Sequence, residues 1–166
     1  MLIYHPAFDA YHCVFRMLLL TNSLKMIEYS KLRILDFYLC FPAEISKIEL
    51  PKAMQSIRNV AKGARNKFRG PVSALRTFRD LEQIQNSAVR LLAASEIFDS
   101  KMLEEGIIIR SDRALPEELK RSTSTIQRQP NELTTFVLAE LSKLELQGTG
   151  GLKQRTGLME YRYDPV

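Results

Sequence analysis

Residues 30–42 read SKLRILDFYLCFP, and this stretch decides how the surrounding sequence is interpreted. Leu32, Leu35 and Leu39 recur at intervals of three and four residues, the spacing that places side chains on one face of a helix. Further large apolar residues between them, including Phe37, widen that face beyond a single stripe. Pro42 ends the pattern because proline lacks the amide hydrogen that would continue a helix. The stretch therefore predicts a helix over residues 30–41 that is buried on more than one side.

The rest of the chain shows mainly helical periodicity. Asp9 precedes one apolar repeat as a suitable N-cap, and Pro116 precedes another at the favoured first helical position. The pattern between Val72 and Ser95 is the longest, with an apolar stripe that includes Phe78, Leu81 and Ala88. Other helices are expected in the ranges 9–22, 51–61 and 100–105, from Pro116 onward, and from Pro130 or Asn131 to Leu144.

Two short segments are expected to be strands. Ile107–Ile109 is a run of β-branched residues, and Gly157–Tyr163 alternates between apolar and polar residues. Glycines between residues 148 and 151 would form a turn before the second segment. The predicted fold class is mostly α (α+β), a single domain over 1–166 with a winged-helix-like C-terminal portion and a short β-hairpin. Residues 63–71 are expected to form an exposed basic loop.

Length and composition are those of an ordinary globular protein. The 166 residues are 45% hydrophobic and 26% charged, with two cysteines, which favours a reducing compartment over a disulfide framework. The longest apolar run near the N-terminus, Met17–Leu20, is far too short to cross a bilayer. The N-terminus has no basic leader, so we expect a cytoplasmic protein without membrane insertion.

Motifs for phosphate and metal binding are incomplete. Gly148–Lys153 (GTGGLK) resembles a phosphate-binding loop, but a predicted helix precedes the glycines where that motif requires a strand. The possible metal ligands are confined to one cluster, His5, Asp9, His12 and Cys13, and no second ligand pair accompanies it. We therefore expect neither a nucleotide cofactor nor a metal ion.

The sequence offers no constellation for nucleophilic catalysis. Such catalysis needs a nucleophile within reach of a base and an orienting group. His12 and Cys13 are adjacent in sequence, and adjacent side chains on a helix point apart. No pair of carboxylates stands out either, so we expect a protein that is not an enzyme.

The charge distribution is the strongest positional signal. The formal net charge is +5, yet the segment from Lys52 to Arg79 contains eight basic residues and no acidic one. The following segment, Asp80 to Glu105, carries six acidic residues against two basic ones. Concentrated like charge is disfavoured unless it is solvated or meets a partner of opposite charge.

Three interpretations of the basic segment remain open: a solvated face, a contact with nucleic-acid phosphates, and a contact with an acidic protein surface. Phe68 within the loop could stack on a base or pack against the domain. The candidate DNA- or partner-binding residues are basic side chains of this segment and of the expected wing: Lys62, Arg65, Lys67, Arg69, Arg76, Arg79, Lys153 and Arg155.

Three stretches together carry a family resemblance: Tyr4–Arg16 (YHPAFDAYHCVFR), Leu32–Pro42 (LRILDFYLCFP) and the basic middle segment. They resemble the small middle-component proteins of bacterial ABC three-component conflict systems, which include the small subunit of Lamassu anti-phage defence. The first two stretches are mostly apolar, so packing explains them better than catalysis. Arg16, Arg33 and Asp36 are polar exceptions that could form an internal ion pair.

The resemblance implies a non-catalytic subunit that accompanies a large SMC-like coiled-coil ATPase and an effector, often a nuclease. In such systems the ATPase senses foreign DNA and the small subunit helps to assemble and restrain the effector. The acidic stretch Asp80–Glu105 could then face a basic partner. The alternative is a stand-alone winged-helix transcriptional regulator that binds double-stranded DNA, and the fold class alone does not choose between the two.

Overall fold

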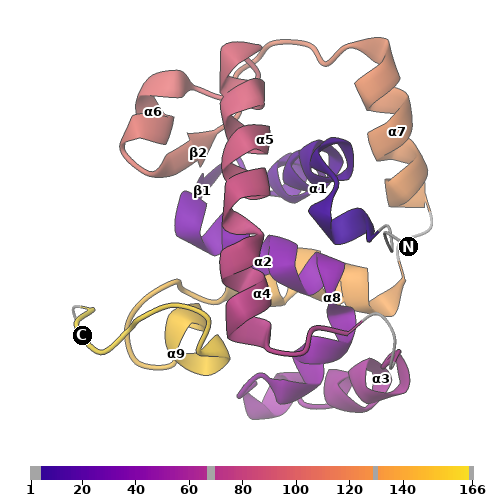
Figure 1. Ribbon diagram of the computed structural model, residues 1–166, viewed down its shortest axis with the longest axis vertical. Coiled ribbons are helices and arrows are strands. Elements are labelled where there is room, and N and C mark those ends of the chain that lie inside the picture. Colours follow the sequence, from indigo (N-terminus) through magenta and orange to yellow (C-terminus); the bar gives the residue numbers. More distant parts are fainter. Residues whose placement is uncertain (1–4, 67–69, 129–130, 165–166) are drawn as a thin grey trace.

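The computed structural model describes residues 5–66, 70–128 and 131–164. The α-helices alternate with short 3-10 turns and two short strands (Figure 1). The α-helices, in chain order, are α1 (Ala10–Ser23), α2 (Tyr29–Cys40), α3 (Ile57–Gly63), α4 (Ala74–Asp80), α5 (Glu82–Ala94), α6 (Ser100–Glu104), α7 (Glu117–Arg128), α8 (Glu132–Ala139) and α9 (Leu152–Thr156). The 3-10 turns are η1 (Pro6–Phe8), η2 (Pro42–Lys47), η3 (Lys52–Met54) and η4 (Leu141–Lys143).

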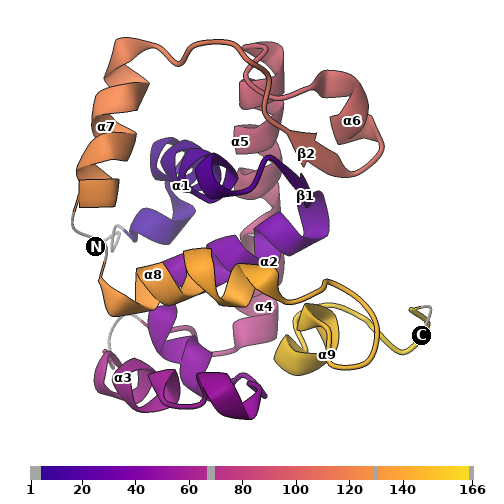
Figure 2. The ribbon, with the colours of Figure 1, turned by 180° about the vertical axis from the view of Figure 1, so that it is seen from behind.

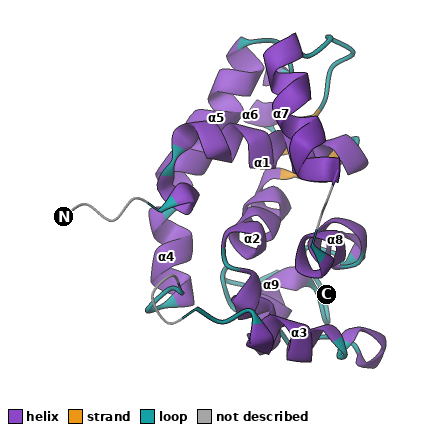
Figure 3. Ribbon diagram, turned by 90° about the vertical axis from the view of Figure 1, so that its right-hand side faces the viewer, coloured by secondary structure: helices purple, strands orange, loops and turns teal. Residues whose placement is uncertain are grey.

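Helix α2 lies at the centre of the molecule, as its apolar pattern suggests. Every residue from Leu32 to Tyr38 is buried, including the charged Arg33 and Asp36. Seen from the side, α4 and α5 lie on one side of the layer that contains α1 and α2, and α8 lies on the other (Figure 3). A helix covered on both sides needs apolar residues around most of its circumference, which accounts for the unusually wide apolar surface of this stretch.

Helices α4 and α5 form an almost continuous column across the front of the molecule (Figure 1). Ser73 caps α4 by accepting a hydrogen bond from the amide of Arg76, and Leu81 joins the two helices while keeping helical backbone angles. The long helix expected from Val72 to Ser95 is therefore present, with a break at Leu81. Its buried face is rotated from the expected stripe, because Gln85 is buried whereas Leu91 is 56% exposed.

The two strands come from distant parts of the chain. β1 (Met26–Glu28) and β2 (Ile107–Ile109) pair antiparallel, with Ile27 opposite Ile108, and both of these central side chains are buried. The expectation of a mostly helical chain with a short antiparallel strand pair is confirmed. Ile107–Ile109 finds its partner near the N-terminus rather than at the C-terminus.

The C-terminal strand expected over Gly157–Tyr163 is wrong. The chain instead forms helix α9 and then turns that contain no strand in the described residues up to Asp164. A strand needs a neighbour to satisfy its backbone groups, and the sheet in the described residues consists of β1 and β2 alone. Leu152 and Leu158 attach this region to the core, so the winged arrangement expected here does not form.

Gly151 is required by the packing at the start of α9. A Cβ atom at this position would lie 2.7 Å from the carbonyl carbon of Gln147, a backbone atom that cannot rotate away. We expect Gly151→Ala to lower the free energy of unfolding by about 1–3 kcal/mol, the usual cost of overpacking. The matched control is Gly63→Ala, because a Cβ there meets nothing within 4 Å. Urea denaturation of both variants tests this, and equal stability would contradict it.

Candidate functional site

A buried ion pair joins the two segments that carry the family resemblance. Arg16 of α1 donates from Nε to Asp36 Oδ1 of α2 at 2.6 Å. The guanidinium also donates to the carbonyl oxygens of Pro6 and Ala7, each at 3.3 Å, so it holds the N-terminal turn η1 against the core. Asp36 is fully buried. Such a charge is tolerated only when it is paired and hydrogen-bonded.

Gln85 of α5 extends this pair into a cluster of polar side chains. Its Nε2 donates to Asp36 Oδ2 at 2.9 Å, and its Oε1 accepts from Arg33 Nε, also at 2.9 Å. Arg33 in turn pairs with Glu82 at 3.3 Å and lies 4.7 Å from the ring centroid of Phe78. We call Arg16, Asp36, Gln85, Arg33 and Glu82 the polar cluster. It ties α1, α2 and α5 together.

The polar cluster is built for structure rather than for proton transfer. Burial alone lowers the pKa of Arg16, but the Asp36 carboxylate more than offsets this and raises the pKa above its ordinary value. Both oxygens of Asp36 accept hydrogen bonds from Arg16 and Gln85. These hydrogen bonds hold the guanidinium and the carboxylate against each other and fix the three helices that carry Arg16, Asp36 and Gln85.

The candidate cations of the basic segment lie on the surface. Lys62 and Arg65 are exposed at the end of α3, and Arg76 and Arg79 are exposed on α4. Within the part of the chain that the structure describes, none of these four makes an ion pair, whereas several other surface lysines do. Lys67, Arg69 and Phe68 lie outside the described residues.

The two C-terminal candidates are engaged within the chain. Lys153 forms a 2.9 Å ion pair with Asp164, and both side chains are mostly buried. Arg155 donates to the backbone oxygens of Glu49 and Gly150, which fixes α9 against the segment after η2. The structure therefore does not place Lys153 and Arg155 on a wing as unpaired charges. Each side chain would have to leave a contact within the chain before it could bind a partner.

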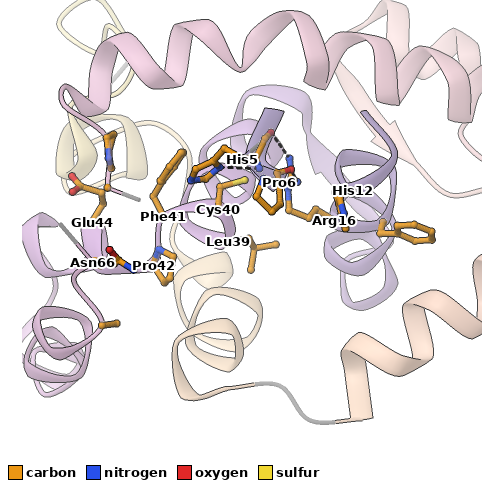
Figure 4. Close-up of a pocket in the computed structure, with 16 residues that line it drawn as sticks. His5, Pro6, His12, Arg16, Leu39, Cys40, Phe41, Pro42, Glu44 and Asn66 are labelled. Atoms are coloured by element: carbon orange, nitrogen blue, oxygen red, sulfur yellow. Dashed lines mark hydrogen bonds between the residues drawn. The ribbon is translucent and has the colours of Figure 1, made fainter. Parts of the chain in front are cut away.

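A cavity of about 410 Å³ opens between the N-terminal turn, the end of α2 and the loop after α3 (Figure 4). Arg16 and Cys40 contribute to its wall, and Leu39 and Pro42 give it an apolar character. Asn66 and Pro71 approach from the loop side. Sequence reasoning did not find this cavity, because its walls come from segments that only the fold brings together.

The candidate metal ligands His5, Asp9, His12 and Cys13 do not converge. Asp9 caps α1 by accepting from the amide of His12 at 2.9 Å, and Cys13 is fully buried. In the described ranges, no group of three or more histidine, cysteine or acidic side chains is placed to hold a metal ion. None of the helices in those ranges combines the length and apolar character needed to cross a membrane.

Comparison with known proteins gives one match, which covers nearly the whole chain. Residues 2–164 match the family described as ABC-three component (ABC-3C) system Middle Component 5. The chain belongs to this family. No curated protein and no solved structure matches it.

For a middle component, the two segments of the resemblance now have a structural explanation. The described part of the first segment, residues 5–16, meets Leu32–Pro42 in the interior, where Arg16 and Asp36 pair and the apolar residues around them form the core. The sequence marked these polar residues as exceptions, but it did not reveal Gln85. The sequence did contain a signal for Gln85: it lies four residues after Leu81 and three before Ala88, so it shares their helix face, which becomes buried.

Both thiols of this middle component are expected to react slowly in the folded state. Burial raises the pKa of Cys13 to about 12 and raises the pKa of Cys40 well above its ordinary value. At pH 8 both are therefore almost entirely protonated, and the thiolate is the reactive form. We expect Ellman's reagent at pH 8 to label denatured protein within seconds and native protein far more slowly. Rapid labelling of native protein would contradict this.

Proposed function

We propose that this middle component is a non-catalytic bridging subunit of a Lamassu-type anti-phage defence complex. It would join an SMC-like coiled-coil ATPase to an effector nuclease and hold the effector in place. Membership of the Middle Component 5 family supports a role within a multi-subunit system. The resemblance of Tyr4–Arg16 and Leu32–Pro42 to small subunits of such complexes supports the particular partners.

The observation that carries the proposal is the unpaired surface charge within the acid-free segment from Lys52 to Arg79. Lys62, Arg65, Arg76 and Arg79 are exposed, and the described residues provide no ion pair for any of them. Arginine can meet carboxylate or phosphate with two parallel hydrogen bonds, so a group of such cations favours an anionic partner. The partner would be an acidic surface of another subunit, with double-stranded DNA as a further contact in the assembled complex.

The polar cluster supports a bridging role over a catalytic one. Its carboxylate and guanidinium groups are used to fix α1, α2 and α5, and Asp36 is closed to solvent. A rigid body with charges on its surface suits a subunit that is docked between others.

A stand-alone winged-helix regulator is the less supported alternative. That function needs a wing to contact phosphates beside a recognition helix. The segment expected to form the wing contains α9 and turns in the residues described up to Asp164, and Lys153 is paired with Asp164. The regulator hypothesis therefore lacks the wing on which it was based.

A stability measurement with and without the partner tests the bridging role. Anything that binds only the folded state raises the unfolding temperature, by an amount that grows with the logarithm of its concentration over its dissociation constant. We expect the SMC-like ATPase of the proposed complex to raise the unfolding temperature, and an unrelated coiled-coil ATPase of similar charge to leave it unchanged. Equal effects of the two would contradict the proposal, as would sequence-specific DNA binding by a symmetric dimer of the chain alone.

A further inference from the structure

The cavity beside the basic loop has the properties of an anchor pocket. We infer that it accepts a bulky apolar side chain of an acidic peptide segment, whose carboxylates meet Lys62 and Arg65. This inference rests on the proposed function and names the chemistry of the partner at the same surface. The cavity volume of about 410 Å³ lies within the range of protein ligand pockets, about 300–1,000 Å³.

The walls of the cavity favour an apolar occupant. Its apolar lining residues include Phe15 of α1, Leu39 at the end of α2 and Pro42 of η2, together with Ala64 and Pro71. Figure 4 shows Leu39 and Pro42 among the side chains around the space. The surface of an open apolar pocket is solvated at a cost in free energy, which an inserted apolar side chain removes.

Arg16 and Glu44, two charged groups in the wall, are already paired within the chain itself. The Arg16 guanidinium is held by Asp36 and two carbonyl oxygens, and Glu44 receives two hydrogen bonds from Lys47 at 2.9 and 2.8 Å. Glu44 is the one carboxylate among the described lining residues. The wall therefore offers no free charge that would demand a charged ligand inside the cavity.

Free positive charge stands at the rim instead. Arg65 lies between two lining residues, Ala64 and Asn66, and Lys62 lies two residues before them. Both cations are exposed, and the segment from Lys52 to Arg79 contains no acidic residue that could neutralise them. An apolar pocket with a basic rim complements an apolar residue flanked by carboxylates.

The same arrangement argues against nucleic acid as the occupant. Phosphate contacts need cations but make no use of an apolar recess. A base could enter such a pocket, but base recognition relies on stacking surfaces and on polar edges that remain free to hydrogen-bond. Here the guanidinium in the wall is already held by three groups of the chain.

Fluorescence anisotropy with defined peptides tests the inference on the full chain. The probe is a labelled nine-residue peptide with one central phenylalanine flanked on each side by four glutamates, measured at about 0.1 M salt. One comparison peptide carries serine in place of phenylalanine, and another carries glutamines in place of the glutamates. A labelled 20-base-pair DNA duplex is the third comparison. We expect each peptide change to weaken binding by about tenfold or more.

Substitutions in the protein provide the matching half of the test. Ala64→Phe fills the cavity and should weaken binding of the phenylalanine peptide about tenfold, while Ala94→Phe, an exposed position on α5 outside the cavity, should not. Thermal unfolding verifies that both variants fold. If Ala64→Phe does not fold, Ala43→Phe takes its place, because Ala43 also lines the cavity.

The outcomes separate this inference from the proposed function. If the serine peptide binds as well as the phenylalanine peptide, or Ala64→Phe has no effect, the pocket is not an anchor site, although the basic surface stands. The inference also fails if no peptide binds, or if the duplex displaces the peptide and binds Ala64→Phe normally. If Lys62→Glu with Arg65→Glu leaves binding of every probe unchanged, the basic surface itself is excluded and the proposed function fails with it.

Discussion

Replacing Asp36 with alanine is expected to lower the free energy of unfolding by about 3–5 kcal/mol, the usual cost of removing one partner from a buried ion pair. The change leaves Arg16, whose side chain is only 13% exposed, without its carboxylate. It also removes one of the two acceptors of the Gln85 side-chain amide, which keeps its longer hydrogen bond to the Arg33 carbonyl oxygen. Both groups then stay buried without full hydrogen bonding, and each adds to the loss. Urea denaturation followed by circular dichroism measures the effect.

Two further variants make the measurement specific to the polar cluster. Glu117→Ala breaks the exposed pair with Lys120 and should change stability by less than about 1 kcal/mol. Adding Arg16→Met to the Asp36→Ala variant should lower the free energy of unfolding by less than Arg16→Met does in the native chain. The reason is that Arg16 has already lost its charged partner in that variant. A loss below about 1 kcal/mol for Asp36→Ala would show that the pair is not structural.

The largest expected effect on binding comes from reversing charge at the end of α3. Lys62→Glu with Arg65→Glu places two negative charges where an anionic partner is expected to dock. We expect affinity for the ATPase or effector to fall by about ten- to a hundredfold, because like charges are then brought together. The remaining binding should depend less on salt, since fewer charge contacts are left to be screened. Surface plasmon resonance at two salt concentrations measures both quantities.

The matched control changes the same net charge elsewhere. Arg90→Glu with Lys101→Glu alters two exposed cations on α5 and α6, inside the segment that is otherwise acidic. This variant should bind as the native chain does. A parallel pair, Arg76→Glu with Arg79→Glu, tests α4 separately. Unchanged affinity in both α3 and α4 variants would remove the basic segment from the binding surface.

Much of the helical fold could be predicted because it depends on local signals. Asp9 caps α1 as expected, Pro42 ends α2, and the isoleucines of β2 form a strand. These features follow from hydrogen-bonding capacity and side-chain shape within a few residues of sequence. The central position of α2 also follows from the width of its apolar face.

The errors arise where distant segments compete. Gly157–Tyr163 has an alternating pattern, but a strand forms only beside a partner, and β2 pairs with β1 across about eighty residues of sequence. The same limit applies to the candidate site. Periodicity could place Gln85 on the buried face, but not opposite Asp36, and it could not show that Lys153 and Arg155 are held by the chain's own groups.

Affinity purification of the tagged chain from cells that encode its own system tests the central claim most directly. Mass spectrometry of the purified material should identify a large coiled-coil ATPase together with a nuclease-like protein, and Lys62→Glu with Arg65→Glu should deplete at least one of them relative to the Arg90→Glu, Lys101→Glu control. Recovery of the chain alone, as a symmetric dimer that retains a specific DNA sequence, would contradict the account.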